Sequence, residues 1–129
     1  MYKYYKLALL TMESFITYSE KIGKNFLFCQ GPGGNTSIKI EDSIYIKKSG
    51  HLLSNSKNNE TFKKVSLSKI TNFYNNISKD EKFDKVLSIE TPLHVMLKSK
   101  YVFHYHSIAS ILISSIYEKD MLNKLLIKN

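Results

Sequence analysis

The sequence predicts an α/β domain built around a mainly antiparallel sheet. Apolar residues at helical spacing alternate along the chain with short stretches of period-two alternation, a pattern typical of mixed helix and strand. Two of those stretches flank the turn residues Glu41 and Asp42, which predicts a hairpin. A length of 129 residues with 43% hydrophobic content suits one compact core. We therefore expect a single domain over residues 1–129.

The N-terminal segment predicts an amphipathic helix over residues 4–22, with Gly23 at the position of a C-terminal cap. Its early apolar run ends before Glu13, and no small-residue cleavage site follows, which argues against a signal peptide. After the helix, the apolar residues 26–29 are expected to form a buried strand.

The middle of the chain predicts a hairpin that follows a glycine-rich loop. The loop covers residues 31–35, and the two alternating strands cover residues 36–40 and 43–48. Residues 49–59 are polar and are expected to form a loop, after which Val65 begins another strand.

The C-terminal half predicts three helices and one further strand. Ser66 is expected to cap a helix through about residue 77, and Pro92 fits the first turn of a helix over residues 91–99. Residues 101–106 are rich in Val, Phe and Tyr and predict a strand. Ser107 is then expected to cap a helix through about residue 117.

The charge pattern argues against specific nucleic-acid binding. The formal net charge is +8, but every cation is a lysine, and the lysines are dispersed over the sequence. A lysine-driven polyanion binder is therefore the weakest of our hypotheses. The single cysteine, Cys29, cannot form an internal disulfide, and no apolar stretch is long enough to span a bilayer. We expect a cytoplasmic protein without membrane contact.

Three side chains are candidates for metal binding and proton transfer. His104 and His106 stand two residues apart in a predicted strand, so both imidazoles project from one face and form half of a tetrahedral metal site. Two partly buried histidines satisfied by hydrogen bonds are the alternative. Glu90 is a candidate general base, and a favourable first-turn glutamate is its alternative role.

A second candidate site is the glycine-rich segment over residues 30–37. Consecutive glycines between strands let backbone N–H groups converge on an anion, and Asn35 and Ser37 add side-chain donors. The stretch Lys48-Ser49-Gly50 offers a second turn with a cation and a hydroxyl. The segment predicts either a phosphate site or an ordinary glycine-rich hairpin turn.

Four motifs occur in the order G-P-G-G-N-T-S-I-K, I-K-K-S-G, S-I-E-T-P-L-H and V-F-H-Y-H. Taken together over about residues 25–115, they resemble the class II aldolase/adducin family. Their residue patterns are most similar to those of the domains related to rhamnulose-1-phosphate aldolase.

The resemblance implies a three-layer α/β/α sandwich around an antiparallel sheet, assembled as a homo-oligomer, usually a tetramer. It implies a divalent metal, most often Zn²⁺, and a phosphorylated sugar as the substrate. The reaction is retro-aldol cleavage of a ketose 1-phosphate to dihydroxyacetone phosphate and an aldehyde, in which the metal stabilises the enediolate. The adducin branch implies an alternative, a non-catalytic binding or oligomerisation module.

The resemblance also assigns roles to individual residues. His104 and His106 are the implied metal ligands, and Glu90 is the implied acid/base carboxylate. The implied phosphate-binding residues are Gly33, Gly34, Asn35, Ser49, Gly50 and Ser88.

The sequence departs from the family pattern after the histidine pair, where we expect the usual C-terminal part to be lacking. Many of the aldolases use a third metal histidine there, and no histidine follows His106. His51, His94 or a partner subunit would have to supply that ligand. The downstream tyrosine proton donor has no counterpart, since Tyr117 lies too close to the pair. His94 shares a helical face with Glu90, either to support the site or to pack the helix.

Overall fold

The computed structural model describes residues 2–76 and 84–116. Its sheet has four strands in the order β3-β2-β1-β4, and every neighbouring pair is antiparallel. The predicted α/β class with an antiparallel sheet is confirmed. The elements are α1 (Tyr2–Lys24), β1 (Asn35–Ile40), β2 (Ser43–Lys47), the 3-10 helix η1 (Leu53–Asn55), β3 (Phe62–Ser66), α2 (Leu67–Asn75), α3 (Thr91–Met96), β4 (Tyr101–His104) and α4 (Ile108–Ile116).

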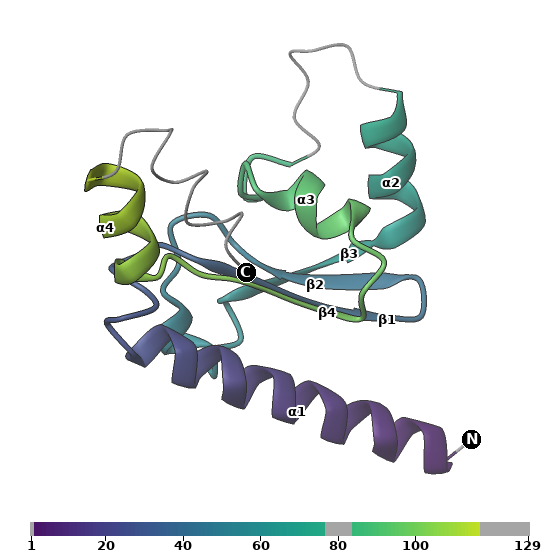
Figure 1. Cartoon of the computed structure of the whole chain (residues 1–129). Coiled ribbons are helices and arrows are strands. Elements are labelled where there is room, and N and C mark those ends of the chain that lie inside the picture. The colour runs from purple at the N-terminus through teal and green to yellow at the C-terminus, as the bar shows by residue number, and fades with distance from the viewer. Residues whose placement is uncertain (1, 77–83, 117–129) are drawn as a thin grey trace, which may run out of the picture.

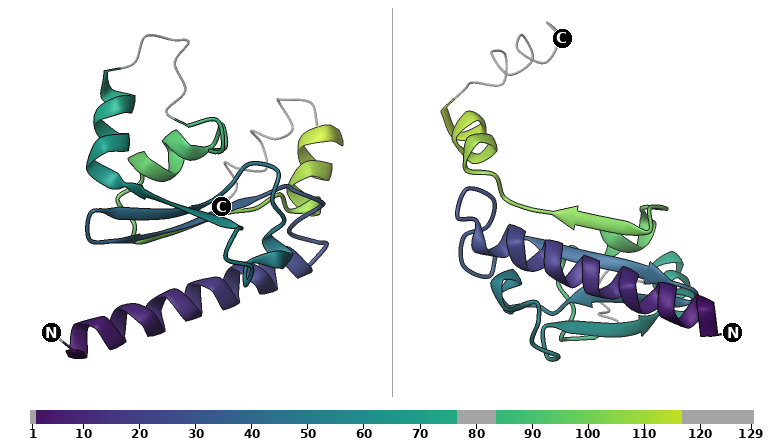
Figure 2. Two further views of the ribbon diagram at one scale, coloured as in Figure 1. Left: turned by 180° about the vertical axis from the view of Figure 1, so that it is seen from behind. Right: turned by 90° about the horizontal axis from the view of Figure 1, so that it is seen from below.

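Helices cover both faces of the sheet. The long helix α1 crosses one face, whereas α2 and α3 pack on the other, and α4 lies beyond one end of the strands (Figure 1). The view from behind in Figure 2 shows the same three layers. Between the sheet and α2 and α3, the core is a cluster of buried aliphatic side chains, namely Ile44, Ile46, Val65, Ile70 and Val95. Burying such side chains is the main stabilising contribution to the domain.

On the α1 face, the core is aromatic. The ring of Phe15 is buried and lies 5.2 Å from the ring of Phe62 and 5.9 Å from the ring of Phe103, measured between centroids. Beside this cluster, the hydroxyls of Ser19 on α1 and Thr36 on β1 form a buried hydrogen bond of 2.8 Å. The helix predicted at the N-terminus is confirmed, and it packs on the sheet through Phe15 and Ser19.

Strand register places polar side chains under α3. The hairpin of β1 and β2 pairs Ser37 with Ile46, and β4 pairs Val102 with Ser37 and His104 with Asn35. Directly paired residues share a face of the sheet, so these side chains point to the face that carries α2 and α3. The predicted hairpin is confirmed, and its register brings His104 beside the first residue of β1.

The strand predicted for residues 26–29 is wrong. The backbone N–H groups of Phe28 and Cys29 donate to the carbonyl oxygen of Asn25, and the Asn25 side chain accepts from the N–H of Leu27. Asparagine favours such local hydrogen bonds, which close a turn and leave no ladder for a strand. Phe26 is consequently 68% exposed.

Gly23 does not cap α1, which continues to Lys24. A Cβ at Gly23 would collide with the backbone of Leu53 and Ser54 in η1. The glycine therefore allows η1 to approach the helix closely, which is a packing requirement rather than a capping one. The 3-10 helix itself falls inside the segment expected to be an irregular polar loop.

Most other boundaries shift by a few residues. Ser66 caps α2 as predicted, since its hydroxyl accepts from the N–H of Lys69. The strand expected from Val65 begins at Phe62, and β4 ends at His104, so His106 lies outside the strand. The expected helix over 91–99 ends at Met96, and α2 ends at Asn75 with Asn76 as its C-cap, short of the expected end at about 77. The expected end of the last helix, at about 117, lies outside the described residues.

Within the described ranges, no helix combines the length and the apolar character needed to cross a membrane.

Candidate active site

The start of α3 and the end of β4 bring a carboxylate and two imidazoles together. Oε1 of Glu90 lies 3.1 Å from Nδ1 of His104 and 3.7 Å from Nε2 of His106. The two histidine rings are 5.1 Å apart between centroids. Although Glu90 is the N-cap residue of α3, its carboxylate makes no capping hydrogen bond to the described backbone and lies instead against the histidines.

A third histidine, His94, joins this cluster from the next turn of α3. One ligand atom each from Glu90, His94 and His104 lie within 4.8 Å of one another, which makes the three a group that could hold a metal ion. His94 is fully buried, and its Nδ1 forms a 2.8 Å hydrogen bond with Oγ of Ser37. The sequence analysis considered His51 and His94 as substitutes for the missing third metal histidine. Among the described residues, His94 belongs to this group and His51 does not.

Burial makes the imidazole of His94 neutral at physiological pH. Desolvation lowers the pKa of His94 to about 4; the charge of Glu90 opposes that shift, whereas His104 and Lys39 add to it. A neutral imidazole is the form that binds a metal ion.

Unpartnered nitrogen atoms test whether these residues fit a metal. Nε2 of His94 and Nδ1 of His104 are buried and have no hydrogen-bond partner among the described residues. Glu90 approaches Nδ1 of His104 closely but without hydrogen-bond geometry. Zinc with ligands at about 2.0 to 2.1 Å in a tetrahedron separates those ligands by about 3.4 Å. The donor set of one carboxylate and two imidazoles therefore fits a divalent cation such as zinc.

Next to the cluster lies a cavity of about 420 Å³. Seven of the residues singled out from the sequence line it, together with three that were not. The lining is Pro32, Gly33, Gly34, Lys47, Ser49, Gly50, Ser88, Ile89, Glu90 and His106. The structure thus brings the glycine-rich loop, the second turn and the acidic residue to one cavity, while their chemical roles remain predictions.

Backbone contacts explain why these loops converge. An isolated bridge joins Lys48 to Leu87, and the N–H of Ser49 donates to the carbonyl oxygen of Val86 at 2.9 Å. This bridge carries Ser88 to the turn at the end of β2. On the other side, Gly34 has φ of +73°, a conformation that favours glycine, and a Cβ there would come 2.9 Å from Sγ of Cys29.

Lys47 is a site residue that the sequence analysis missed. It is only 2% exposed, and its Nζ donates to the carbonyl oxygens of Pro32 at 3.1 Å and His51 at 2.8 Å. Burial lowers the pKa of Lys47, while the charges of Glu90 and Cys29 raise it. Its position at the end of a strand that leads into a Ser-Gly turn was a signal that could have identified it.

Lys48, the cation that the sequence analysis associated with this turn, is directed elsewhere. Its Nζ forms a 2.7 Å ion pair with the carboxylate of Glu60, and Lys48 does not line the cavity. The cation at the cavity is therefore Lys47 rather than Lys48.

Two predicted phosphate-binding residues differ in detail from expectation. The N–H of Gly33 donates to the carbonyl oxygen of Gln30 at 3.1 Å, so this amide closes the turn. Asn35 is buried without lining the cavity, and neither atom of its side-chain amide has a hydrogen-bond partner within the described ranges.

The hydroxyl of Ser88 accepts a hydrogen bond from the N–H of Glu90 at 3.0 Å, which leaves its hydroxyl proton for another acceptor.

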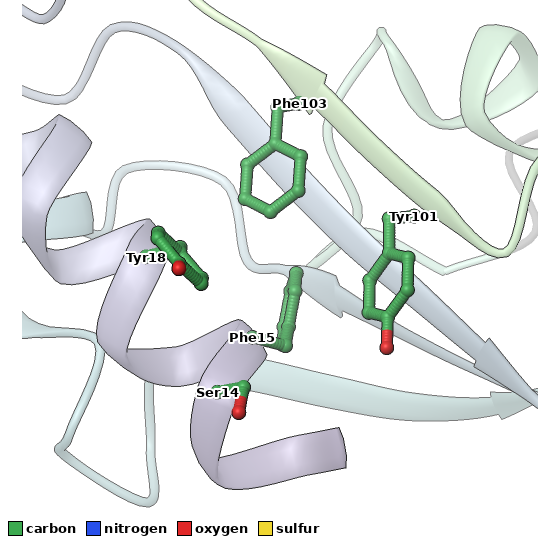
Figure 3. Close-up of a pocket in the computed structure, with 5 residues that line it drawn as sticks. All are labelled: Ser14, Phe15, Tyr18, Tyr101 and Phe103. Atoms are coloured by element: carbon green, nitrogen blue, oxygen red, sulfur yellow. The ribbon is translucent and has the colours of Figure 1, made fainter.

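A second cavity, of about 340 Å³, lies on the opposite face of the sheet. Figure 3 shows Phe15 and Tyr18 from α1 facing Tyr101 and Phe103 from β4, with Ser14 at its edge. Its lining is aromatic and includes no carboxylate or imidazole, so it lacks the carboxylate-histidine group of the first site.

Comparison with known proteins identifies the family of the chain. The family model described as the class II aldolase and adducin N-terminal domain matches residues 14–128. The chain belongs to this family. A comparison with the curated proteins finds no match.

Among solved structures, the chain is similar to the N-terminal class II aldolase domain of a conserved protein from Thermoplasma acidophilum. The TM-score is 0.63 at 24% sequence identity, and the match covers 87% of this chain. It covers 62% of the other chain, so this chain spans less than two thirds of that domain's length. This likeness shows that the two chains share a fold.

Proposed function

We propose that the protein is a metal-dependent, aldolase-like protein that binds a phosphorylated sugar. The observation that carries the proposal is the shared position of two features: a carboxylate-histidine cluster and a cavity lined by glycine, serine and lysine. Glu90 belongs to both, so an anionic ligand in the cavity would reach the metal group. Family membership supports the same chemistry.

The phosphate end of the ligand would lie at the glycine-rich side of the cavity. Hydroxyls of Ser49 and Ser88 supply neutral donors there, and Lys47 supplies the positive charge. An ammonium has three N–H donors, and carbonyl oxygens of Pro32 and His51 account for two of them. The third donor remains for a phosphate oxygen.

The sugar end would meet Glu90 and His106. Retro-aldol cleavage breaks one carbon–carbon bond without oxidation or reduction. A proton leaves the hydroxyl on the carbon that becomes the aldehyde, and another is added to the carbon retained in dihydroxyacetone phosphate. Glu90, on the cavity wall, is the residue we assign to carry these protons.

A divalent cation, zinc in our proposal, would polarise the carbonyl oxygen beside the breaking bond when it is bound. Glu90 and the histidines that contact it are the residues that would hold the cation. The residue pattern around Glu90 is similar to that of the relatives of rhamnulose-1-phosphate aldolase. Ketose 1-phosphates are therefore the substrates to test first.

The decisive assay measures aldehyde release from a panel of ketose 1-phosphates in the presence of zinc. Loss of general acid/base catalysis in the Glu90→Gln variant should lower release at least about 100-fold. Glu60→Gln is the matched control, because the carboxylate of Glu60 is exposed, forms an ion pair with Lys48 and does not line the cavity. Release that does not depend on Glu90 would contradict the proposed acid/base role.

A second candidate function is a non-catalytic module that associates with copies of itself. Helix α4 carries no charged residue, and the side chains of Ile111, Leu112 and Ile113 are about half exposed. A helix that is apolar on all sides usually packs against more than one partner. If sedimentation shows a homo-oligomer while thermal melts show no stabilisation by zinc or sugar phosphates, this function is the better account.

A further inference from the structure

We propose that the outer edge of β4 binds an extended, acidic peptide segment of another polypeptide, which adds a strand to the sheet and places an apolar side chain in the aromatic cavity beside α1. By the aromatic cavity we mean the second cavity, lined by Ser14, Phe15, Tyr18, Tyr101 and Phe103. The inference goes beyond the proposed function and does not rest on it, because the peptide would contact neither the metal group nor the cavity beside Glu90.

The outer edge of β4 carries backbone groups without partners. In the ladder with β1, the N–H of Lys39 donates to the carbonyl oxygen of Lys100 at 2.8 Å, so these two residues form a hydrogen-bonded pair. Such pairs alternate along an antiparallel ladder, so the N–H and C=O groups of Tyr101 and Phe103 point away from β1. The sheet order places β4 at an edge, and no described strand pairs with its outer side. Two donors and two acceptors are therefore available to a further strand.

The two edges of the sheet differ in how they are protected. The other edge strand, β3, contains Lys63 and Lys64, and charged side chains of this kind discourage pairing with another strand. The sequence of β4 is Tyr-Val-Phe-His, with neither a lysine nor a carboxylate. Of the two edges, β4 is therefore the one suited to accept a partner strand.

The aromatic cavity lies directly beside this edge. Tyr101 and Phe103, which supply the outward backbone groups, also form one wall of the cavity, and Phe15 and Tyr18 of α1 form the other (Figure 3). The view from below in Figure 2 shows that α1 leaves β4 uncovered. At about 340 Å³, the cavity is near the lower end of the range for ligand pockets, about 300 to 1,000 Å³.

A groove between an edge strand and a helix is an arrangement that binds extended peptides. Hydrogen bonds to the edge strand supply affinity, and a pocket that receives alternate side chains of the peptide supplies specificity. The edge of β4 offers the first element and the aromatic cavity offers the second. An aromatic or long aliphatic side chain is the chemistry that suits an aromatic lining.

Two lysines indicate that the peptide is acidic. Nζ of Lys21 lies 5.5 Å from the ring centroid of Tyr18, and Nζ of Lys100 lies 5.7 Å from that of Tyr101. One lysine therefore stands at each wall of the cavity. Neither forms an ion pair with a carboxylate of the described residues. Carboxylates on either side of the apolar side chain would complement these charges.

A second copy of this chain is a poorer occupant of the groove. If two β4 strands paired with each other, neither would bring a carboxylate to the lysines, because the strand contains none. A small anionic amphiphile would fill the cavity and meet the lysines, but it would not use the backbone groups of the edge. The test separates both alternatives from the peptide.

The test measures binding of a fluorescein-labelled peptide, Glu-Thr-Phe-Thr-Glu with blocked ends, by fluorescence anisotropy. Its alternation directs the phenyl ring and both carboxylates to the face that carries α1. Exchanging both glutamates for lysine should weaken binding at least about 10-fold at low salt and by less at high salt. Methylation of two consecutive backbone nitrogens removes a hydrogen bond to β4 in either register and should weaken binding at least about fivefold. A loss on charge exchange without a loss on methylation would favour a small amphiphile and overturn the proposal.

Variants of β4 separate the backbone from the ring. Tyr101→Ala and Tyr101→Pro both remove the ring, but only proline removes the outward N–H, at the first residue of the strand where proline is tolerated. The proline variant should bind the peptide at least about fivefold more weakly than the alanine variant. Lys100→Met should weaken binding about two- to fivefold, whereas Lys24→Met, which removes a charge paired with Glu20, should leave it unchanged. Equal affinities in the proline and alanine variants would contradict a strand at this edge.

A measurement on the unaltered protein covers the case in which a variant does not fold. Amide hydrogen exchange followed by NMR should slow at Tyr101 and Phe103 when the peptide is added, and it should not change in β3. Exchange at these two amides that is already slow without the peptide would overturn the proposal, as would a dimer in sedimentation that Tyr101→Pro dissociates. Zinc and dihydroxyacetone phosphate should not displace the peptide, so a failure at β4 leaves the proposed function intact.

Discussion

The carboxylate of Glu90 and the imidazole of His104 approach within 3.1 Å, although they belong to different elements. Glu90 begins α3 and His104 ends β4, and the loop that carries Glu90 is joined to the end of β2 through the Lys48–Leu87 bridge. This one relationship connects the group that could hold a metal ion to the cavity, because Glu90 belongs to both.

Replacing Lys47 should separate phosphate binding from general surface charge. Lys47→Met removes the buried cation of the cavity, whereas Lys48→Met removes the same charge one residue away, where it pairs with Glu60. Loss of a charged hydrogen bond of about 1.5 to 3 kcal/mol should weaken binding of dihydroxyacetone phosphate about 10- to 100-fold in Lys47→Met alone. Titration calorimetry measures this, and equal affinities in the two variants would argue against a phosphate at Lys47.

The stability of the metal-free protein should depend on pH through His94. Its pKa falls from 6.5 to about 4 on folding because the ring is buried, so the unfolded chain binds the proton more tightly. The contribution of His94 to the free energy of unfolding should therefore be complete above pH 6.5. It should decrease by about 3 kcal/mol as the pH falls from 6.5 to 4. Urea titrations with chelator present measure this dependence, which His94→Gln should lack. An equal dependence in both proteins would exclude His94 as its source.

Adding a methyl group at Gly34 should disturb the glycine-rich loop, because Gly34 lies against both Cys29 and His104. Gly34→Ala forces an L-residue into φ of +73° and places its Cβ 2.9 Å from Sγ of Cys29 and 3.1 Å from the His104 carbonyl oxygen. We expect a loss of about 2 to 4 kcal/mol in unfolding free energy from the combined strain. Gly31→Ala is the control, because φ there is +55° but nothing lies within 4 Å, and it should lose only about 1 to 2 kcal/mol. Equal losses would mean that the contacts of Gly34 are unimportant.

Truncating Phe15 should show how strongly α1 is held on the sheet. Its buried ring contacts the rings of Phe62 and Phe103, so Phe15→Ala should lower the unfolding free energy by about 3 to 5 kcal/mol. Tyr18→Ala, one turn later on α1, removes a side chain that is 58% exposed and should cost less than about 1.5 kcal/mol. Chemical denaturation compares the two, and a small loss for Phe15→Ala would contradict the observed packing.

The fold was predictable where the signal is local. The hairpin follows from the alternating residues on either side of Glu41 and Asp42, and the cap at Ser66 follows from the preference of serine for that position. The segment 26–29 was assigned wrongly, because its apolar composition suggested a strand while Asn25 closes a turn. Gly23 was also misjudged, since its role depends on η1, a contact that the sequence does not reveal.

For the candidate site, the sequence indicated which residues to consider but not which neighbours surround them. Glu90, Ser88 and the glycine-rich loop do reach one cavity, as their motif order suggested. Lys47 was overlooked because an alternating strand with two consecutive lysines does not show which of them turns inward. The Ser37 and His94 pair depends on the register of β1 under α3, which is a tertiary property.

The most direct test of the account is anomalous diffraction at the zinc edge from crystals grown with zinc and dihydroxyacetone phosphate. We predict one strong peak bounded by Glu90, His94 and His104, with phosphate density beside Lys47 in the same cavity. A zinc ion bound away from Glu90, or a phosphate outside the cavity, would contradict the central claim that both share a single site.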